Sequence, residues 1–404
     1  MMMKNITLSN VTDEAGLFID GDWIESKDQD PNGEVRLIQL ADIGDGIFLN
    51  KSHRFLTKKK ALELKCTFLQ KGDLLIARMP APLGRTCIFP GDERECVTVV
   101  DIGILRPNSK EISNEYLKYL VNSSDFRNKI ISYTTGTTRK RISRSNLDKI
   151  HFNLPVYEDQ IRIAAVLIQA EKLIVKRKES IKVLDELLKS TFLEMFGDLQ
   201  KNKSTNVVKT IEEICKFKGG GTPSKAKPEY FTGNIPWVSP KDMKSLYVCS
   251  SIDKITQEAI INSSTSLIPK GSVLMVVRSG ILKNKLPVAI NTVDVTINQD
   301  IKAFTSKVVI ASYLLYFFIS NEKIMLKKVR ATTADNFNFD DIKKMKIMIP
   351  SLPLQHQFAA IVEKAEVLKA KYTQNLTELE NLYSSLSQRA FKGELDLSKV
   401  PLEK

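Results

Sequence analysis

The side chains best suited to chemistry in this 404-residue chain are cations gathered in one short stretch. Residues 134–146 read TTGTTRKRISRSN and carry Arg139, Lys140, Arg141 and Arg144 without any acidic residue. Arg and Lys neutralise phosphates, while Arg, Asn, Ser and Thr can hydrogen-bond to base edges in the major groove. A solvated loop before a strand is the alternative interpretation. For the stretch as a whole, contact with DNA is favoured.

Residues for catalysis or metal binding form no recognisable motif. No two histidines stand at metal-ligand spacing, and the three are His53, His151 and His356. The run KGGGTP at 218–223 lacks the P-loop pattern and is interpreted as a turn. Asp45 with Glu63 and Lys65 fits a loose nuclease pattern that chance produces in chains of this length. The chain is therefore expected to be no enzyme and to hold no metal.

Composition and charge narrow the class of partner. The chain has 60 Lys and Arg against 47 Asp and Glu, a net charge of +13, which favours a polyanion, with nucleic acid ahead of a membrane surface. The longest apolar runs are far shorter than the ~20 residues that span a bilayer, and no signal segment follows Met1. The five cysteines are few and widely spaced, which indicates reduced, mostly buried thiols. A cytoplasmic protein is expected.

The elements that must position these side chains occur twice, because the sequence repeats at an interval close to 200 residues. GEVRLIQLADI at 33–43 returns as GNIPWVSPKDM at 233–243. FLQKGDLLI at 68–76 returns as LIPKGSVLM at 267–275, and Arg78 and Arg278 follow soon after. The order of these landmarks indicates a tandem duplication.

Each copy joins a globular α+β part to a long helix. Short β-branched runs between Gly, Pro and Asn turns predict the strands of the globular part. We align LPVYEDQ, which starts at Leu154, with LPLQHQ, which starts at Leu352, so that Pro155 and Pro353 precede the helices. Gly197 and Gly393 are expected to end them as C-terminal caps. The expected organisation is a globular domain at 1–155, a long helix at 156–198, a second globular domain at 199–353, a second long helix at 354–394 and a tail at 395–404.

Apolar residues in steps of three and four along both helices are typical of a heptad seam. The seam residues are Leu167, Ile174, Arg177, Ile181, Leu184, Leu188, Ile361, Leu368, Asn375, Leu379, Leu382 and Leu386. Duplicated units usually meet about a two-fold axis, which makes the helices antiparallel and brings Arg177 close to Asn375. A buried polar pair of this kind fixes register at some cost in stability. The alternative is that each helix packs only on its own domain.

The second copy carries a family pattern. GGTPSK at 220–225, EYF at 229–231, GNIPWV at 233–238 and KDM at 241–243 resemble the opening of a target-recognition domain in the DNA-specificity subunits of type I restriction-modification systems. LIQLADIGDG at 37–46 is similar to another opening of that family. The resemblance covers essentially the whole chain in the family order.

Other landmarks agree with this family, and two depart from it. The Lys-Gly strands at Lys71 and Lys270, the Leu-Pro starts of both helices and the FGD and FKGEL endings agree. Val156 stands where the family has a second proline, and copy two has fewer cations around Thr332 than copy one has around Thr138. The base contacts of copy two are therefore less clearly marked.

The resemblance implies an α+β fold with two target-recognition domains held apart by two long helices, which form an antiparallel coiled coil with pseudo-two-fold symmetry. Each domain would read one half of a bipartite double-stranded DNA target. The chain itself would be non-catalytic and without a cofactor. Two methyltransferase subunits that bring S-adenosylmethionine would dock on the helices, and restriction subunits that use ATP and Mg²⁺ would join them. No membrane partner is implied.

The expected helices also suit a ruler. About 36 residues at ~1.5 Å each give ~54 Å, and half-sites one duplex turn apart lie ~34–36 Å from one another. The candidate DNA contacts are Arg78, Arg139, Lys140, Arg141 and Arg144 in copy one and Trp237, Lys241, Arg278, Lys283, Lys285, Arg330 and Asn336 in copy two. Three alternatives remain open: a subunit of a related system with a fused methylase-nuclease partner, a stand-alone enzyme, and a coiled-coil adaptor without a DNA role.

Overall fold

The computed structural model describes residues 3–12, 16–107, 111–136, 139–197, 207–330 and 336–402. The chain forms two compact units, which we call unit 1 (Met1–Lys178 with Asn375–Lys404) and unit 2 (Glu179–Gln374). Each unit therefore combines one globular part with a segment of both long helices. The sequence-based division keeps each helix whole, whereas the compact units divide both helices near their middles.

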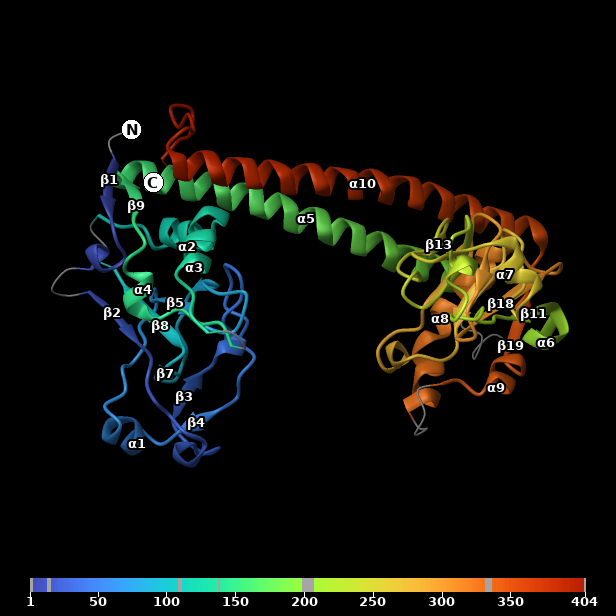
Figure 1. Cartoon of the computed structure of the whole chain (residues 1–404), viewed down its shortest axis with the longest axis horizontal. Coiled ribbons are helices and arrows are strands. Elements are labelled where there is room, and N and C mark those ends of the chain that lie inside the picture. The colour runs from blue at the N-terminus through green and yellow to red at the C-terminus, as the bar shows by residue number, and fades with distance from the viewer. Residues whose placement is uncertain are drawn as a thin grey trace. The chain divides into compact units, whose positions relative to one another are not determined.

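The described residues of unit 1 form three sheets and four short helices (Figure 1). Its strands are β1 Met3–Ile6, β2 Leu17–Asp20, β3 Val35–Ile38, β4 Phe55–Leu56, β5 Leu74–Ala77, β6 Thr86–Ile88, β7 Cys96–Thr98, β8 Ile102–Arg106 and β9 Phe152–Pro155. Its short helices are α1 Lys58–Glu63, α2 Asn114–Asn122, α3 Ser124–Ser132 and α4 Arg144–Leu147, and its 3-10 turns are η1 Ser9–Val11, η2 Ser26–Asp28 and η3 Leu40–Asp42.

Unit 2 repeats this set of elements. Its strands are β10 Val207–Thr210, β11 Cys215–Gly219, β12 Ile235–Val238, β13 Tyr247–Val248, β14 Lys254–Ile255, β15 Val273–Val276, β16 Val288–Asn291, β17 Thr296–Ile297, β18 Ile301–Ser306 and β19 Lys346–Ile349. Its helices are α6 Ile211–Ile214, α7 Gln257–Ile261, α8 Ala311–Arg330 and α9 Phe339–Lys343, with 3-10 turns η4 Pro228–Phe231 and η5 Gly280–Lys283.

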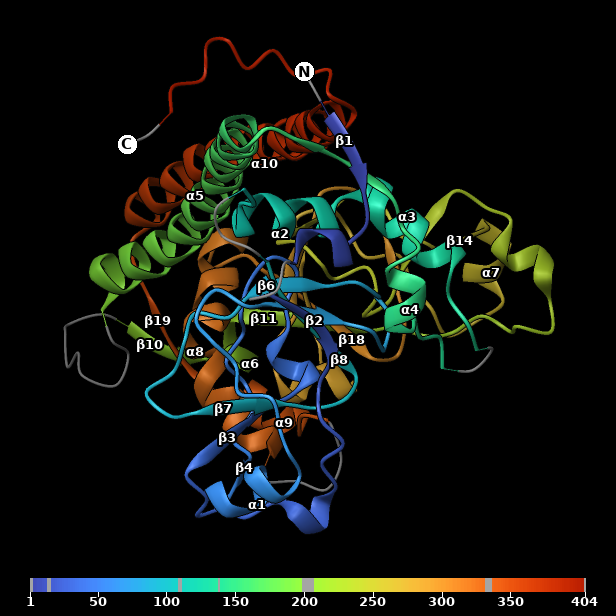
Figure 2. The same ribbon diagram turned by 90° about the vertical axis from the view of Figure 1, so that its left-hand side faces the viewer.

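The two units share one sheet topology, which confirms the predicted duplication. An antiparallel sheet runs β2-β8-β5-β6 in unit 1, with β2, β6 and β8 labelled in Figure 2, and β11-β18-β15-β16 in unit 2, where β13 is added at the edge. A second sheet runs β4-β3-β7 and β14-β12-β17, and in both copies its central strand pairs in parallel with the last one. The pairs β1-β9 and β10-β19 complete each set. Register agrees as well, since Leu74 faces Leu105 and Val273 faces Phe304.

The turn before the central strand is stabilised differently in the two copies. Asp73 is only 1% exposed, and Arg106 donates to its two carboxylate oxygens from Nε and Nη2, both at 2.7 Å. At the equivalent place in unit 2, Ser272 and Asn291 are buried and uncharged, and the backbone N–H of Ser272 donates to Asn291 Oδ1 at 2.8 Å. One corner of the fold thus depends on an ion pair and the other on neutral hydrogen bonds.

The long helices are α5, Tyr157–Phe196, and α10, Leu352–Lys392. Both end as predicted, because Gly197 and Gly393 take positive φ values of 81° and 77°, which favour glycine. The amide of Gly197 donates to Leu193 O at 2.8 Å, and that of Glu394 donates to Arg389 O at 2.8 Å. These bonds satisfy carbonyls that the last helical turn leaves unpaired.

The starts of the helices correct the predicted alignment. Gln160 of α5 is buried, and its Nε2 donates to Pro155 O at 2.9 Å. Gln355 of α10 does the same with Pro350 O at 2.9 Å. The equivalent residues are therefore Pro155 with Pro350 and Gln160 with Gln355, so the alignment with Pro353 and Gln357 is wrong.

Two consequences follow for the prolines at the helix starts. Pro353 lies inside the first turn of α10, where a proline is tolerated because its missing N–H would be unpaired in any case. The residue at that place in copy one is Glu158, three residues after Pro155, and not Val156.

Within each unit, the segment of α5 packs against the segment of α10. In unit 1, Ile163 and Leu167 share the core with Ala390, and Lys178 Nζ lies 2.8 Å from Glu380 Oε1. In unit 2, the rings of Phe192 and Phe358 lie 5.4 Å apart, and Lys369 Nζ lies 2.5 Å from Asp185 Oδ1. In both units, residues later in α5 meet residues earlier in α10, so the two segments run antiparallel.

The predicted seam needs two corrections. Leu382 is 51% exposed and Leu368 is 37% exposed, so neither lies in the packed face. Tyr383, the next residue after Leu382, packs against the unit 1 core instead. An α-helix drifts by ~20° per heptad relative to a strict 3.5-residue repeat, so a fixed sequence of steps leaves the packed face.

The remaining seam residues are buried or half-buried. Leu167 and Leu188 are buried, while the others, Ile174, Arg177, Ile181, Leu184, Ile361, Asn375, Leu379 and Leu386, are half-buried. Arg177 and Asn375 thus keep more solvent contact than the predicted buried pair would have. Their pairing stays a prediction.

The cysteines and the longest apolar helices bear on the compartment expected from the sequence. Cys66, Cys87, Cys96 and Cys215 are buried and Cys249 is exposed, all five as free thiols. Burial raises the pKa of the Cys87 and Cys215 thiols to about 12, which makes them unreactive. In the part of the chain that the structure describes, no helix is long and apolar enough to cross a membrane.

Candidate nucleic-acid interface

The cation-rich stretch of unit 1 forms a loop beside the central strand. We call the described residues 134–136 and 139–146 the basic loop; Thr137 and Thr138 lie outside the described residues. Thr135 and Arg141 bond to one another through both backbone amides at 3.0 Å, and Gly136 adopts a φ of 93°. Ile142 is buried and its amide donates to Arg78 O at 3.1 Å. The backbone of the loop is therefore fixed against β5.

Arg78 is directed inward, which corrects its prediction as a DNA contact. Its guanidinium donates to the carbonyls of Val100 and Ile142 and lies 3.4 Å from Asp20 Oδ1, and its side chain is 12% exposed. Because Nη1 and Nη2 are occupied within the unit, Arg78 positions the basic loop. Arg144 also makes a hydrogen bond within the unit, because its Nη1 donates to Phe18 O at 2.9 Å.

The other three cations of the loop are available to a ligand. Arg139, Lys140 and Arg141 are exposed. Among the described residues, their side chains take part in no hydrogen bond or ion pair. Three neighbouring uncompensated charges repel one another, and a polyanion that neutralises them gains affinity by releasing its counterions. The basic loop is thus the strongest candidate contact with DNA in unit 1.

Unit 2 places an arginine one position further along, because the register of the two sheets makes Val277 the equivalent of Arg78 and Arg278 the residue after it. The amide of Phe337 donates to Val277 O at 2.8 Å, as the amide of Ile142 donates to Arg78 O, and the backbone of Arg278 bridges to Asn336. Arg278 Nε donates to Asp300 Oδ1 at 2.7 Å, yet its side chain stays 57% exposed. Asn336 is exposed as well. Residues 331–335 and the side chain of Arg330 lie outside the described residues.

The remaining predicted contacts of unit 2 divide into exposed lysines and one buried tryptophan. Lys241, Lys283 and Lys285 are exposed and remain candidates. Trp237 is 7% exposed, and its indole Nε1 donates to Gly221 O at 3.0 Å, so its prediction as a DNA contact is wrong. Trp237 packs against Phe231 in a small core of its own.

The glycine-rich run next to Trp237 has a packing role. A Cβ on Gly220 would lie 2.1 Å from Asn298 O, and one on Gly221 would lie 2.3 Å from Ser264 Oγ. Only glycine permits so close an approach of two backbone segments. The predicted turn is wrong, because Lys218 and Gly219 belong to β11 and residues 220–223 continue as irregular backbone.

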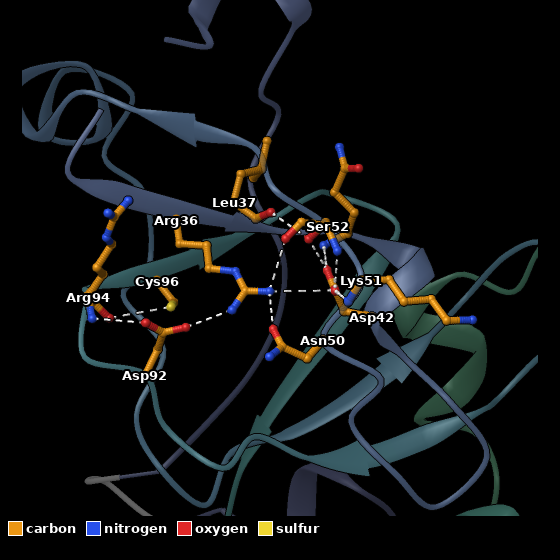
Figure 3. Close-up of polar contacts among 10 residues, drawn as sticks. Arg36, Leu37, Asp42, Asn50, Lys51, Ser52, Asp92, Arg94 and Cys96 are labelled. Carbon is orange, nitrogen blue, oxygen red and sulfur yellow. Dashed lines mark hydrogen bonds and ion pairs between the residues drawn. The ribbon is translucent and has the colours of Figure 1, made fainter. Parts of the chain in front are cut away.

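A buried polar cluster supports the loop that follows β3 in unit 1 (Figure 3). Arg36 donates from Nη1 to Asp92 Oδ2 at 2.7 Å and from Nη2 to Asn50 Oδ1 at 2.5 Å. Asp42 is fully buried and accepts from the backbone amides of Lys51 at 2.7 Å and Ser52 at 2.8 Å. The cluster connects the far ends of this loop and fixes its path.

The pKa of Asp42 reflects two opposing causes. Burial raises the pKa of the carboxyl, but hydrogen bonds from the Ser52 hydroxyl and from the amides of Gln39, Ser52 and Lys51 outweigh burial and hold the pKa below its ordinary value of 3.8. Asp42 is therefore a charged structural residue at neutral pH.

The loose nuclease pattern is not assembled into a site. Asp45 accepts from Arg127 Nη1 at 3.0 Å, and Glu63 pairs with Lys60 at 2.9 Å. Over the described ranges, His, Cys, Asp and Glu form no group of three that could hold a metal ion.

Sequence reasoning missed Trp23. This side chain is 71% exposed and lines the same concave surface as Arg139 and Arg141. Its polar neighbours in sequence, Asp22 and Glu25, are a signal of exposure that could have identified it.

Comparison with known proteins agrees with this arrangement. Residues 7–183 and 203–381 each match the family described as “Type I restriction modification DNA specificity domain”. The Escherichia coli EcoR124I/EcoR124II specificity subunit is 40% identical over 172 residues, which cover 42% of this chain and 43% of that protein. The Methanocaldococcus jannaschii MjaIX specificity subunit is 22% identical over 389 residues, which cover 91% of this chain and 88% of that protein.

Two solved structures share the fold. One comes from work on complex assembly and conformational transition of the type I restriction-modification system; it has a TM-score of 0.65 and 17% identity and covers 97% of this chain and 98% of that one. The type I S subunit from M. genitalium has a TM-score of 0.51 and 14% identity and covers 97% and 96%. The two matched segments together span most of the sequence, and the chain belongs to the type I restriction-modification DNA specificity family.

Proposed function

We propose that this chain reads a bipartite double-stranded DNA target for a type I restriction-modification complex, with one half-site for each unit. The observation that carries the proposal is the repeated sheet with a loop bonded to the residue after its central strand, at Arg78 and at Val277, which precedes Arg278. In unit 1 that loop presents the unpaired cations of Arg139, Lys140 and Arg141. Phosphate contacts would orient each unit, and neighbouring polar side chains would read bases in the major groove.

The two long helices would set the non-specific gap between the half-sites. Helices of 40 and 41 residues at ~1.5 Å per residue are each ~60 Å long. This exceeds the ~34–36 Å between the centres of half-sites one duplex turn apart. The antiparallel packing within each unit supports one coiled coil with pseudo-two-fold symmetry.

Exposed apolar residues on the helices would dock partner subunits. Leu173 and Val175 are more than half exposed in unit 1, as are Val183 and Leu187 in unit 2. Solvent-facing apolar groups of this kind are typical of protein–protein interfaces. One methyltransferase subunit for each unit would bind here, and restriction subunits would join the assembly.

Catalysis would belong to these partners. Specificity subunits of this family are generally non-catalytic. S-adenosylmethionine would be bound by the methyltransferases, and ATP and Mg²⁺ by the restriction subunits. The present chain would contribute recognition and spacing.

Modification-sensitive long-read sequencing of the host genome, with the gene intact and deleted, tests the proposal. Loss of methylated adenine from one split motif on deletion is expected, and it would also supply both half-sites and the gap. If methylation does not change even when the chain is co-expressed with the methyltransferase, the proposal is wrong. A DNA-free adaptor would in addition show no salt-dependent binding to duplex DNA.

A further inference from the structure

A concave surface of unit 1 combines features that suit a nucleobase. The segments after β2 and before β8, together with the basic loop, enclose about 430 Å³. This volume lies within the ~300–1,000 Å³ of ordinary small-molecule sites. Trp23, Ile24 and Met79 supply apolar surface, and Arg139 and Arg141 supply positive charge. The lining also includes three acids, of which Asp22 accepts from the Thr67 amide and Glu25 pairs with Lys27, while the third is Asp101.

Trp23 is unusually exposed for its type. Its indole Nε1 donates to Glu25 Oε1 at 3.2 Å, which satisfies its polar atom and leaves the ring surface uncovered. An indole left in water forgoes the free energy of burying a large apolar surface. Tryptophan is also enriched among the residues that dominate binding energy in interfaces. A bound ligand would cover the ring.

Asp101, which lines the same surface, lacks the hydrogen-bond donors that its equivalent in unit 2, Asp300, has. In unit 2, the equivalent Asp300 accepts from Arg278 Nε at 2.7 Å and from Asn298 Nδ2 at 2.9 Å. In unit 1, the equivalent of Arg278 is Met79, whose side chain has no donor, and Arg78 is directed to Asp20 and to the Val100 carbonyl. Within the described ranges, the half-buried carboxylate of Asp101 accepts no hydrogen bond. The duplicated fold thus neutralises this acid in one copy and leaves it available in the other.

The sign of the charges selects the part of DNA that this surface can hold. A carboxylate accepts hydrogen bonds and repels phosphate, so Asp101 suits contact with a base, whereas the exposed Arg139 and Arg141 suit contact with the phosphate backbone. In the major groove, cytosine presents only the amino donor at N4, whereas adenine places the N7 acceptor beside its N6 donor. An acceptor-only side chain therefore favours cytosine.

Resting on the proposed function, we propose that Asp101 and Trp23 form a base-reading subsite of unit 1. Asp101 accepts a hydrogen bond from the N4 amino group of one cytosine in the half-site. Trp23 packs its ring against the apolar part of the adjoining base step. Arg139 and Arg141 hold the flanking phosphates and carry no sequence preference.

The test uses the full chain in complex with its methyltransferase subunits and duplexes that contain the methylated motif, each half-site position varied in turn. Asp101→Asn should reduce the preference for cytosine at one position of one half-site by about 5- to 140-fold, the equivalent of ~1–3 kcal/mol. Trp23→Ala should weaken binding of the cognate motif without changing the salt dependence. Arg139→Ala should weaken all sequences alike and lower the salt slope by ~1. Asp253→Asn, which removes the same charge from an exposed site of unit 2, is the control and should leave the preference unchanged.

Intrinsic fluorescence gives a direct second readout, because the chain has only two tryptophans and Trp237 is buried. Cognate DNA should quench the emission of the wild type, and Trp23→Phe should abolish most of that change.

The outcomes separate this inference from the proposed function. If Arg139→Ala weakens binding while Asp101→Asn and Trp23→Ala leave affinity, preference and quenching unchanged, the subsite is refuted and the proposed function stands. If the Arg139→Ala and Arg141→Ala variants also bind like the wild type, the basic loop is no DNA contact and the subsite is refuted, whereas the proposed function falls only if the wild-type chain shows no salt-dependent binding to duplex DNA.

Discussion

Replacing Gln160 by leucine should loosen the start of α5 by an amount that the structure allows us to work out. Its Oε1 accepts from the amide of Ser113 at 2.9 Å, and its Nε2 donates to Glu111 O at 3.0 Å and to Pro155 O at 2.9 Å. Leucine has a similar volume but makes none of these bonds. At ~1 kcal/mol for each lost bond, Gln160→Leu should cost about 3 kcal/mol.

The second copy supplies a matched comparison. Gln355 makes two such bonds, accepting from the amide of Ile310 at 2.9 Å and donating to Pro350 O at 2.9 Å. Gln355→Leu should therefore cost about 2 kcal/mol on the same scale. Gln357, which sequence alignment pairs with Gln160, is exposed. Gln357→Leu should cost almost nothing.

Amide hydrogen exchange measures each effect where it arises. At 1.4 kcal/mol per tenfold, exchange of the Ser113 amide should accelerate about 140-fold in Gln160→Leu. The Ile310 amide should accelerate about 30-fold in Gln355→Leu. Unchanged protection of Ser113 in Gln160→Leu, or a loss of Ile310 protection in Gln357→Leu, would refute the reasoning.

Three further predictions concern acid stability, spacing and register. Because the pKa of Asp42 in the folded chain lies below 3.8, its contribution to the free energy of unfolding is complete above that pH and is lost as pH falls through the folded pKa. Asp42→Asn should therefore flatten the acid unfolding curve followed by circular dichroism. An unchanged slope would contradict this prediction. Four residues inserted in both α5 and α10 add ~6 Å, so the sequenced methylation motif should gain ~2 base pairs of gap, and an unaltered gap would count against the ruler. Replacing both Arg177 and Asn375 by leucine should leave the two helices formed but loosen their register. The yield of a disulfide between cysteines introduced at 178 and 380 should then fall. An undiminished yield would show that the pair does not set register.

Much of the fold could be predicted because its signals are local. Gly197 and Gly393 cap the long helices through a backbone conformation that favours glycine in any context. The repeated Lys-Gly turns before apolar strands give β5 and β15 at matching places in two similar sheets. The duplication itself is a property of sequence order and needs no knowledge of packing.

The candidate site was less predictable because exposure depends on distant segments. Arg78 is directed inward by carbonyls at Val100 and Ile142, and Trp237 is buried because Gly221 lets a remote backbone approach. Val100 and Ile142 are not adjacent to Arg78 in the sequence, and Gly221 is not adjacent to Trp237. Side-chain type alone therefore suggested DNA contact for two residues that the fold uses internally.

The turn before the central strand is stabilised by an ion pair in unit 1 and by neutral hydrogen bonds in unit 2, and this difference has a consequence for how new specificities arise. Genetic exchange between the two copies at a point between residues 73 and 106 would join Asp73 to Thr305, the counterpart of Arg106. The hybrid would bury an uncompensated carboxylate, at a cost of ~3–5 kcal/mol. Internal shuffling should therefore succeed only when a whole recognition sheet is transferred, so that lineages diversify by trading intact modules and not by assembling mosaics within one.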